Sequence, residues 1–163
     1  MTKSISEILE ELNQPFDPED VKWLPGVFMG QGKVQALAYA DPRVYIDRLN
    51  EVLGAANWGK SYNTTIATGL TKVVKQYQKE NLVLTGTGKI FVTCTVNIPS
   101  LGVSTSDVGE SDLSDDNAYT VAASQAFKRA CVQFGLGRYF YDLPKYVIKY
   151  SKEEGFSDLP TLS

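Results

Sequence analysis

The sequence predicts an α+β domain in which a three-stranded antiparallel β-meander packs on a long α-helix. Residues 61–108 contain three strand-like segments joined by short links, which favours an antiparallel meander. Apolar residues then recur at helical spacing over residues 119–134. Two further helices are expected before the sheet, one N-terminal and one directly preceding the strands. A length of 163 residues suits one domain with a sizeable core.

The N-terminal helix is predicted by local signals. Ser4 and Glu7 are spaced as in a capping box, and apolar residues follow at helical spacing. A glycine-containing turn at residues 30–32 then leads into a short strand over residues 33–40. Residues 21–30 show no clear pattern.

The helix before the sheet is expected to begin at Asp41 and Pro42. Aspartate caps a helix, and proline fits its first position. The apolar residues Ile46, Leu49, Val52 and Leu53 share one face of this helix, and Gly54 is a typical stop.

The predicted meander has strands over residues 61–75, 82–98 and 103–108. The first is interrupted at most by Gly69, and residues 76–81 are turn-like. In the second, five apolar residues alternate with more polar ones, which is the period of a strand with one buried face. These residues are Ile90, Val92, Cys94, Val96 and Ile98.

The long helix is predicted to follow cap residues at 114–117. Its expected apolar face consists of Tyr119, Ala123, Ala126, Phe127, Ala130 and Phe134, a sector of about 100°. By the same geometry Lys128 points roughly opposite the centre of that face and Arg129 about 110° from it. We expect the domain to cover residues 1–150 and residues 151–163 to form a flexible C-terminal tail.

The composition excludes several classes of site. There is no histidine, so a serine–histidine or cysteine–histidine nucleophile and a typical zinc site are excluded. Cys94 and Cys131 lie in apolar patterns and are expected to be buried thiols, as in a reducing cytoplasm. We expect no cofactor, no bound metal, no membrane span and no signal peptide.

Charge is segregated along a chain whose net charge is −3. Residues 60–89 hold five lysines and one glutamate, a net of +4, and residues 118–152 hold six basic residues and one aspartate, a net of +5. Residues 100–117 hold five carboxylates and no base, a net of −5. This segregation can build a basic surface on an acidic protein, or the charges can neutralise each other in space.

Three groups of residues have both a functional and a structural interpretation. Lys128, Arg129 and Arg138, with the aromatic run at residues 139–141, suit a nucleic-acid surface, or a solvated helix followed by a packed turn. The lysines of the meander could guide a phosphate backbone or protect an edge strand; they are Lys72, Lys75, Lys79 and Lys89. The acidic segment could bind Mg²⁺ or cap the next helix; its carboxylates are Asp107, Glu110, Asp112, Asp115 and Asp116.

Two motifs resemble a known family. The first runs Asp107-Val108-Gly109-Glu110, Ala122-Ala123-Ser124-Gln125-Ala126-Phe127-Lys128-Arg129-Ala130, and Gln133-Phe134-Gly135-Leu136-Gly137-Arg138-Tyr139-Phe140-Tyr141-Asp142-Leu143-Pro144. The second is Arg43-Val44, Asn50-Glu51-Val52-Leu53-Gly54 and Asn57-Trp58. Across residues 33–144 the chain resembles the DdrA family of bacterial DNA-damage-response proteins. More distantly, it is similar to the eukaryotic single-strand-annealing recombination mediators of the Rad-fifty-two type.

The resemblance implies a protein that assembles side by side into a homo-oligomeric ring with single-stranded DNA in a groove. Lys128 and Arg129 match the basic pair that faces this groove, while a third basic position of the family falls on Val132. Looser matches place Lys22 and Tyr39 in the groove. The other expected contacts to DNA are Lys33, Arg43, Lys60 and Arg138.

We therefore expect a non-enzymatic protein that binds single-stranded DNA, and anneals complementary strands or protects ends in recombinational repair. It would be cytoplasmic, or nucleoid-associated if bacterial, and other repair proteins are possible partners. Two alternatives remain at this point: a protein-interaction scaffold without DNA binding, and a carboxylate-metal nuclease.

Overall fold

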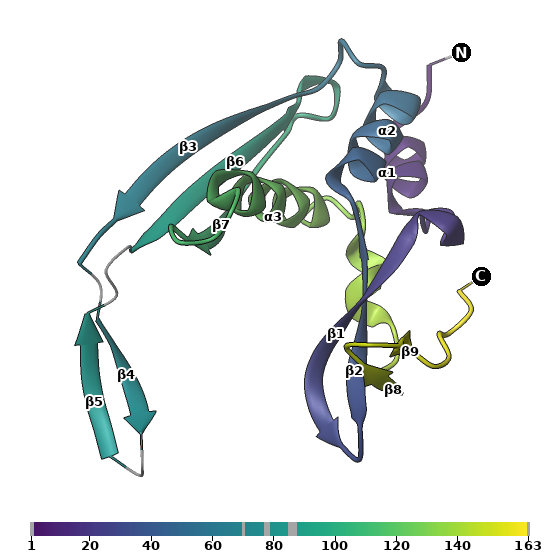
Figure 1. Ribbon diagram of the computed structural model, residues 1–163. Helices are drawn as coiled ribbons and strands as arrows, with labels where there is room; N and C mark the ends of the chain where they lie inside the picture. Colours follow the sequence, from purple (N-terminus) through teal and green to yellow (C-terminus); the bar gives the residue numbers. More distant parts are fainter. Residues whose placement is uncertain (1, 70, 77–78, 85–87, 163) are drawn as a thin grey trace. The chain divides into compact units, whose positions relative to one another are not determined.

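The computed structural model describes residues 2–69, 71–76, 79–84 and 88–162, with side chains for residues 2–69 and 88–162. The chain forms two compact units (Figure 1). The terminal unit comprises Met1–Val52 and Gly135–Ser163, and the central unit comprises Leu53–Phe134. One domain over residues 1–150 stays a prediction. No helix among the described residues is long and apolar enough to cross a bilayer.

Both predicted helices of the N-terminal half are present. Helix α1 spans Ile5–Asn13, and the Ser4 Oγ atom accepts a hydrogen bond of 3.1 Å from the Glu7 amide. After the short 3₁₀ helix η1, Pro18–Asp20, helix α2 spans Pro42–Leu53. Its start is capped by Asp41, whose Oδ1 atom accepts a bond of 2.9 Å from the Arg43 amide.

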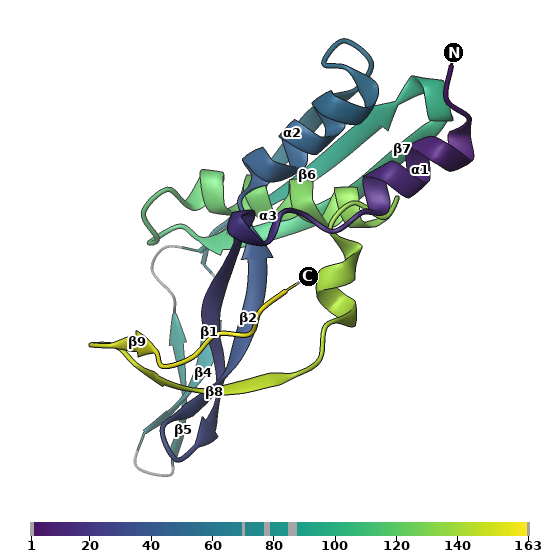
Figure 2. The same cartoon turned by 90° about the vertical axis from the view of Figure 1, so that its right-hand side faces the viewer.

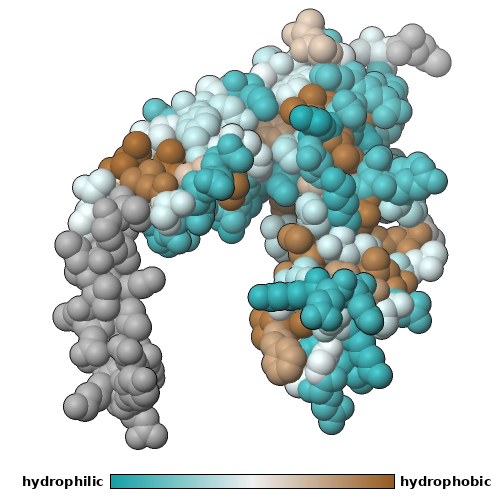
Figure 3. All heavy atoms as spheres, viewed as in Figure 1, coloured by the Kyte–Doolittle hydropathy of each residue, from teal (hydrophilic) through white to brown (hydrophobic). Residues whose placement is uncertain are grey.

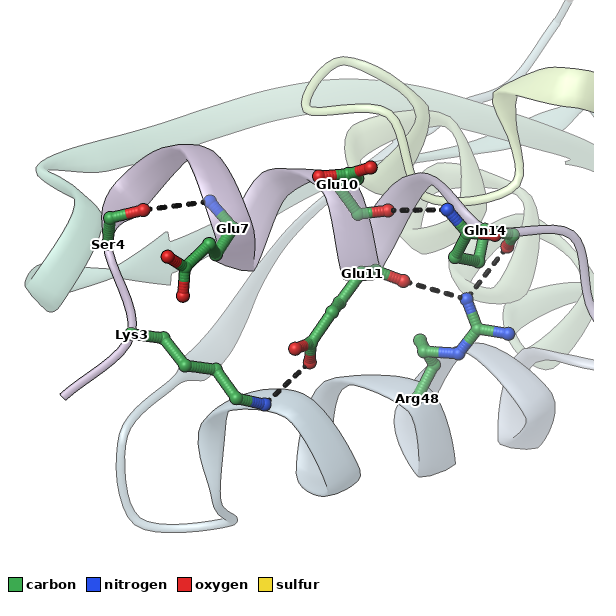
Figure 4. A network of polar contacts seen from close by, with 7 residues as sticks. All are labelled: Lys3, Ser4, Glu7, Glu10, Glu11, Gln14 and Arg48. Carbon is green, nitrogen blue, oxygen red and sulfur yellow. Dashed lines mark hydrogen bonds and ion pairs between the residues drawn. The ribbon is translucent and has the colours of Figure 1, made fainter. Parts of the chain in front are cut away.

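Arg48 connects α2 to the C-terminal end of α1 (Figure 4). Its Nη1 atom donates to the carbonyls of Glu11 at 3.1 Å and Gln14 at 2.7 Å, and Nη2 donates to Pro15 at 3.0 Å. The last carbonyls of a helix have no partner within the helix and carry partial negative charge. The guanidinium satisfies one of them, that of Glu11, together with the Gln14 and Pro15 carbonyls just beyond the helix, because its donors form a fixed fork.

The sheet of the terminal unit has the order β1-β2-β8-β9 (Figure 2). It is built from β1 Val21–Gly30, β2 Lys33–Ala40, β8 Tyr146–Ser151 and β9 Gly155–Phe156. Only β2 was predicted. In β1, register shifts after Pro25 and Phe28 break the alternation by which a strand is recognised.

The range predicted as a flexible tail contains regular structure. Ser151 ends β8, and Gly155 pairs with it in β9. The Ser157 amide then donates to the Lys149 carbonyl at 3.1 Å, whereas residues 158–162 lie outside helices and strands. Pairing with β8 therefore orders part of this range, and no local pattern indicated it.

The central unit confirms the three-stranded meander but divides two of its predicted strands. Its sheet has the order β3-β6-β7, from β3 Gly59–Ala67, β6 Lys89–Ile98 and β7 Val103–Asp112. A separate two-stranded sheet lies between β3 and β6 in sequence, made of β4 Thr71–Gln76 and β5 Lys79–Leu84. The first predicted strand is interrupted next to Gly69, the interruption that the sequence allowed. The single strand expected over residues 82–98 is wrong, because residues 79–84 and 89–98 belong to different sheets.

Helix α3, Ala118–Val132, packs on β6 and β7 (Figure 1). The alternating apolar residues of β6 are all buried, as predicted. The helix buries Ala122, Ala123, Ala126, Phe127, Ala130 and Cys131. Two expectations were wrong: Tyr119 is 46% exposed, and Asn117, with φ 59°, makes no side-chain cap.

A glycine explains why the buried face of α3 is rich in alanine. A Cβ atom built on Gly109 of β7 would lie 2.1 Å from the Ala122 carbonyl oxygen and 2.8 Å from the Ala126 nitrogen. The backbones of helix and strand thus approach more closely than any side chain allows. Small residues fill such an interface, which leaves the larger Tyr119 ring outside it.

Candidate nucleic-acid interface

Three polar side chains, two from α3 and one from the residue that caps its C-terminal end, lie along the free edge of β7. Gln125, Arg129 and Gln133 follow each other at four-residue intervals, so they share one side of the helix. The Gln125 Oε1 atom accepts from the Glu110 amide at 2.9 Å. Arg129 Nη1 donates to the Val108 carbonyl at 3.0 Å, and Gln133 Nε2 donates to the Ser106 carbonyl at 2.6 Å. Backbone groups that an edge strand leaves unpaired are thereby satisfied.

The basic pair of the first motif lies on this helix. Arg129 is exposed and Lys128 is half-buried. A guanidinium has five N–H donors, and the bond to Val108 uses one Nη1 hydrogen. Arg129 is thus held in place by the sheet while other donors remain for an anion. Because a bidentate guanidinium suits phosphate, this geometry is compatible with the predicted DNA contact.

Lys60 is positioned by aromatic rings on the other edge strand, β3. Its Nζ atom lies 4.7 Å from the ring centroid of Phe127 and 5.4 Å from that of Tyr62. Burial raises the pKa of the Tyr62 hydroxyl, which the neighbouring Lys60 partly opposes. The Phe127 ring is 1% exposed and also stacks with Trp58 at 6.2 Å. Both the lysine and the tryptophan are therefore part of the packing around α3.

Lys60 and Arg129 lie on different flanks of α3. Strands β3 and β7 are the two edges of the sheet. Phe127, which Lys60 contacts, and Arg129 are two residues apart and so point about 200° apart around the helix. These two predicted residues are accordingly not brought together into one pocket.

In the terminal unit the structure pairs Lys22 with Tyr39. They lie directly opposite each other on β1 and β2, and directly opposed residues project from the same face. Lys33 lies at the other end of β2, opposite Lys149 of β8. Arg43 lies in the first turn of α2 with an exposed side chain.

The aromatic turn after α3 is mostly a packing element. Arg138 is exposed at the start of the 3₁₀ helix η3, Arg138–Asp142. The Tyr139 and Phe140 rings stack with their centroids 4.4 Å apart, and these centroids lie 6.0 and 5.9 Å from that of the Phe16 ring. Of the three aromatic residues only Tyr141 is largely exposed, at 71%. The structural interpretation thus holds for Tyr139 and Phe140.

The glycines of the Phe-Gly-Leu-Gly turn have a structural cause. Gly135 and Gly137 adopt φ values of 104° and 76°, a region that favours glycine. A Cβ atom on Gly137 would also lie 2.5 Å from the Tyr45 hydroxyl. This part of the motif therefore maintains the fold, whereas Arg129 is exposed on the surface of α3.

The acidic segment does not form a metal centre in the described part of the chain. No group of three or more carboxylate or thiol side chains there could hold a metal ion. Asp107 accepts from Gln133 at 3.2 Å, Asp115 accepts from Ser111 at 3.1 Å, and Glu110 lies 3.6 Å from Lys89. These carboxylates instead join β7 to its neighbours.

The two interpretations of the meander lysines are tested by the structure for only one of these residues. Lys89 lies on β6, the central strand, so it does not protect an edge. The side chains of Lys72, Lys75 and Lys79 lie outside the described residues, and both interpretations of them stay predictions.

The two cysteines are buried thiols, as predicted. Burial raises the pKa of Cys94, and it raises that of Cys131 well above the usual value. Both sulfurs therefore stay protonated at neutral pH and are unreactive.

One basic residue near these sites was missed. Lys149 projects beside Lys33 only because β8 pairs with β2. The run of aromatic and β-branched residues over 146–150 is the signal that could have indicated this strand.

Comparisons with known proteins agree with both motifs. Residues 4–155 match the family model described as Rad52/22 family double-strand break repair protein. A relative from Deinococcus radiodurans, named single-stranded DNA-binding protein DdrA, is 34% identical over 142 residues, which are 86% of this chain and 58% of the relative. A protein of the same name from Deinococcus deserti is 34% identical over 148 residues, 90% of this chain and 63% of the relative.

The chain spans about three fifths of the length of these curated relatives. The family match covers nearly all of its own residues, so the resemblance seen in the sequence is confirmed. This chain belongs to the Rad52/22 family of double-strand break repair proteins.

Proposed function

We propose that this chain binds single-stranded DNA and, in recombinational repair, anneals complementary strands or protects their ends. The observation that carries the proposal is the pair Lys128 and Arg129. Arg129 is exposed and held by the Val108 carbonyl, so a phosphate can bind without the cost of ordering a free side chain. The names of the two Deinococcus relatives support the same ligand.

The protein would act by binding alone, without catalysis or a cofactor. Basic residues would hold phosphates while the bases stay accessible to a complementary strand. Such binding is steeply salt-dependent and largely independent of base sequence. Assembly into a homo-oligomeric ring, contacts to other repair proteins and a cytoplasmic or nucleoid location belong to the same proposal.

Fluorescence anisotropy of a labelled 30-base single strand tests it, at two salt concentrations and with the matched duplex as control. We expect the single strand to bind more tightly and lose affinity with salt. Lys128→Ala and Arg129→Ala should each lower affinity about tenfold and flatten the salt dependence by roughly 0.7 in log–log slope.

Lys3→Ala is the control variant, because it removes a lysine that pairs with Glu11 at 2.7 Å far along the chain from α3. Unchanged affinity in both α3 variants would remove the central claim. Absence of any DNA binding by the unmodified protein at low salt would favour a protein-interaction scaffold instead.

A further inference from the structure

The sheet of the terminal unit has two faces of different character. Register sets Trp23 opposite Ala38, and Ala36 opposite Tyr146, and these residues are buried or half-buried. The Trp23 and Tyr146 rings meet edge-on at 5.7 Å across that face. We call the other side the open face. It contains Lys22, Leu24, Lys33, Gln35, Leu37, Tyr39, Val147 and Lys149.

The open face is basic and apolar at the same time. All three lysines of β1, β2 and β8 project from it, and these three strands contain no Asp or Glu. Leu24, Leu37 and Val147 on the same face are 47%, 43% and 43% exposed. Figure 3 shows hydrophobic surface interleaved with hydrophilic surface over the β1–β2 hairpin and β8.

The lysines and apolar residues are arranged in order along the sheet. Lys22 and Tyr39 form one end, and Lys33 and Lys149 form the other. Tyr39 and Lys33 are six residues apart on β2, a distance of roughly 20 Å in a strand. The exposed leucines lie between the two basic ends.

We propose that the open face is a further stretch of the path for single-stranded DNA, extending from Lys22 and Tyr39 to Lys33 and Lys149. This inference rests on the proposed function. The lysines would contact phosphates at both ends, and Leu24, Leu37 and Val147 would contact base or sugar surfaces between them. A polyanion suits a face with three lysines and no carboxylate. A two-fold contact between copies through this face would instead bring like charges together, which is unfavourable.

Charge removal at the far end is the first test. Lys33→Gln and Lys149→Gln should each weaken binding of the 30-base strand about threefold and flatten the log–log salt slope by roughly 0.7. Lys3→Gln, which removes the same charge from the segment before α1, should leave both quantities unchanged. An unaltered slope in both open-face variants would overturn the extension.

Site-directed crosslinking is the second test. Cys94 and Cys131 are buried, so a photoreactive maleimide would label Val147→Cys selectively. Illumination should join this position to the single strand. The adjacent Ile148→Cys, on the opposite face and half-buried, should give little or no DNA adduct. Adducts only between two protein chains, with DNA bound, would show that the face contacts a second copy and would overturn the proposal.

The two proposals fail differently. If the unmodified protein binds no single strand, the proposed function falls and this inference falls with it. If Lys128→Ala and Arg129→Ala weaken binding while the open-face variants and the crosslink give nothing, only this inference falls.

Discussion

The β3–β6–β7 sheet and the β1–β2–β8 sheet both carry basic residues, but they hold them in different ways. In the central unit, Arg129 donates to the Val108 carbonyl and Lys60 lies over the Phe127 ring. In the terminal unit, three lysines project from one face beside exposed leucines. Substituting a basic residue of the central unit should therefore change stability as well as DNA binding. Substituting a lysine of the open face should change DNA binding alone.

The largest effect is expected at the contact between α3 and β7. Gly109→Ala would place a Cβ atom against the backbone of Ala122 and Ala126, neither of which can rotate away as a side chain would. We expect a loss of more than about 3 kcal/mol in the free energy of unfolding, measured by urea titration. Gly59→Ala on β3, where a Cβ atom meets nothing within 4 Å, is the control. A Gly109→Ala variant with an unchanged free energy of unfolding would show that α3 can move away from β7 without destabilising the protein.

A smaller effect is expected when the free edge of β7 loses its side-chain partners. The double variant Gln125→Ala and Gln133→Ala removes bonds to the Glu110 amide and the Ser106 carbonyl. Each bond contributes about 1 kcal/mol, so urea unfolding should show a loss of about 2 kcal/mol. The exposed edge should also promote self-association in sedimentation velocity. Thr120→Ala, at an exposed position of the same helix, should do neither. If the double variant is as stable and as monomeric as Thr120→Ala, the two glutamine side chains do not stabilise the edge of β7.

Alkaline pH should weaken the central unit through its buried thiols. The pKa of Cys131 is raised well above 9.0 by burial, so the unfolded chain releases this proton at a lower pH than the folded chain. The stabilisation is complete below pH 9 and is lost as pH rises through the folded pKa. Unfolding free energies measured from pH 7 to 10.5 should therefore fall more steeply than in Cys131→Ala. Equal slopes would mean that the sulfur is not desolvated.

The smallest effect is expected on the open face. Leu24→Gln and Leu37→Gln replace side chains that are nearly half exposed, and we expect changes of less than about 0.5 kcal/mol in the free energy of unfolding. A loss above 2 kcal/mol in either would show that this face is packed, and would remove the contrast between the two sheets.

Local signals determined several parts of this protein. The starts of α1 and α2 follow from Ser4 and Asp41, because a cap bonds to an amide two or three residues away. The burial of alternate β6 residues follows from their period of two. The basic pair on α3 was identified by its motif, and helix geometry indicated the exposure of Arg129, although Lys128, expected to point away from the packed face, is half-buried. These features depend only on neighbours in the chain.

Tertiary structure decided the rest. The limits of β3 and β6 depend on the separate pairing of β4 with β5, and the contribution of Lys149 to the open face depends on β8 lying beside β2. Arg129 is held by Val108, twenty-one residues earlier in the chain. The sequence by itself determined which residues form helices, alternate in a strand or carry charge. Only the tertiary structure decided which of them meet, because pairing between strands and packing of a helix on a sheet join residues that no local pattern relates.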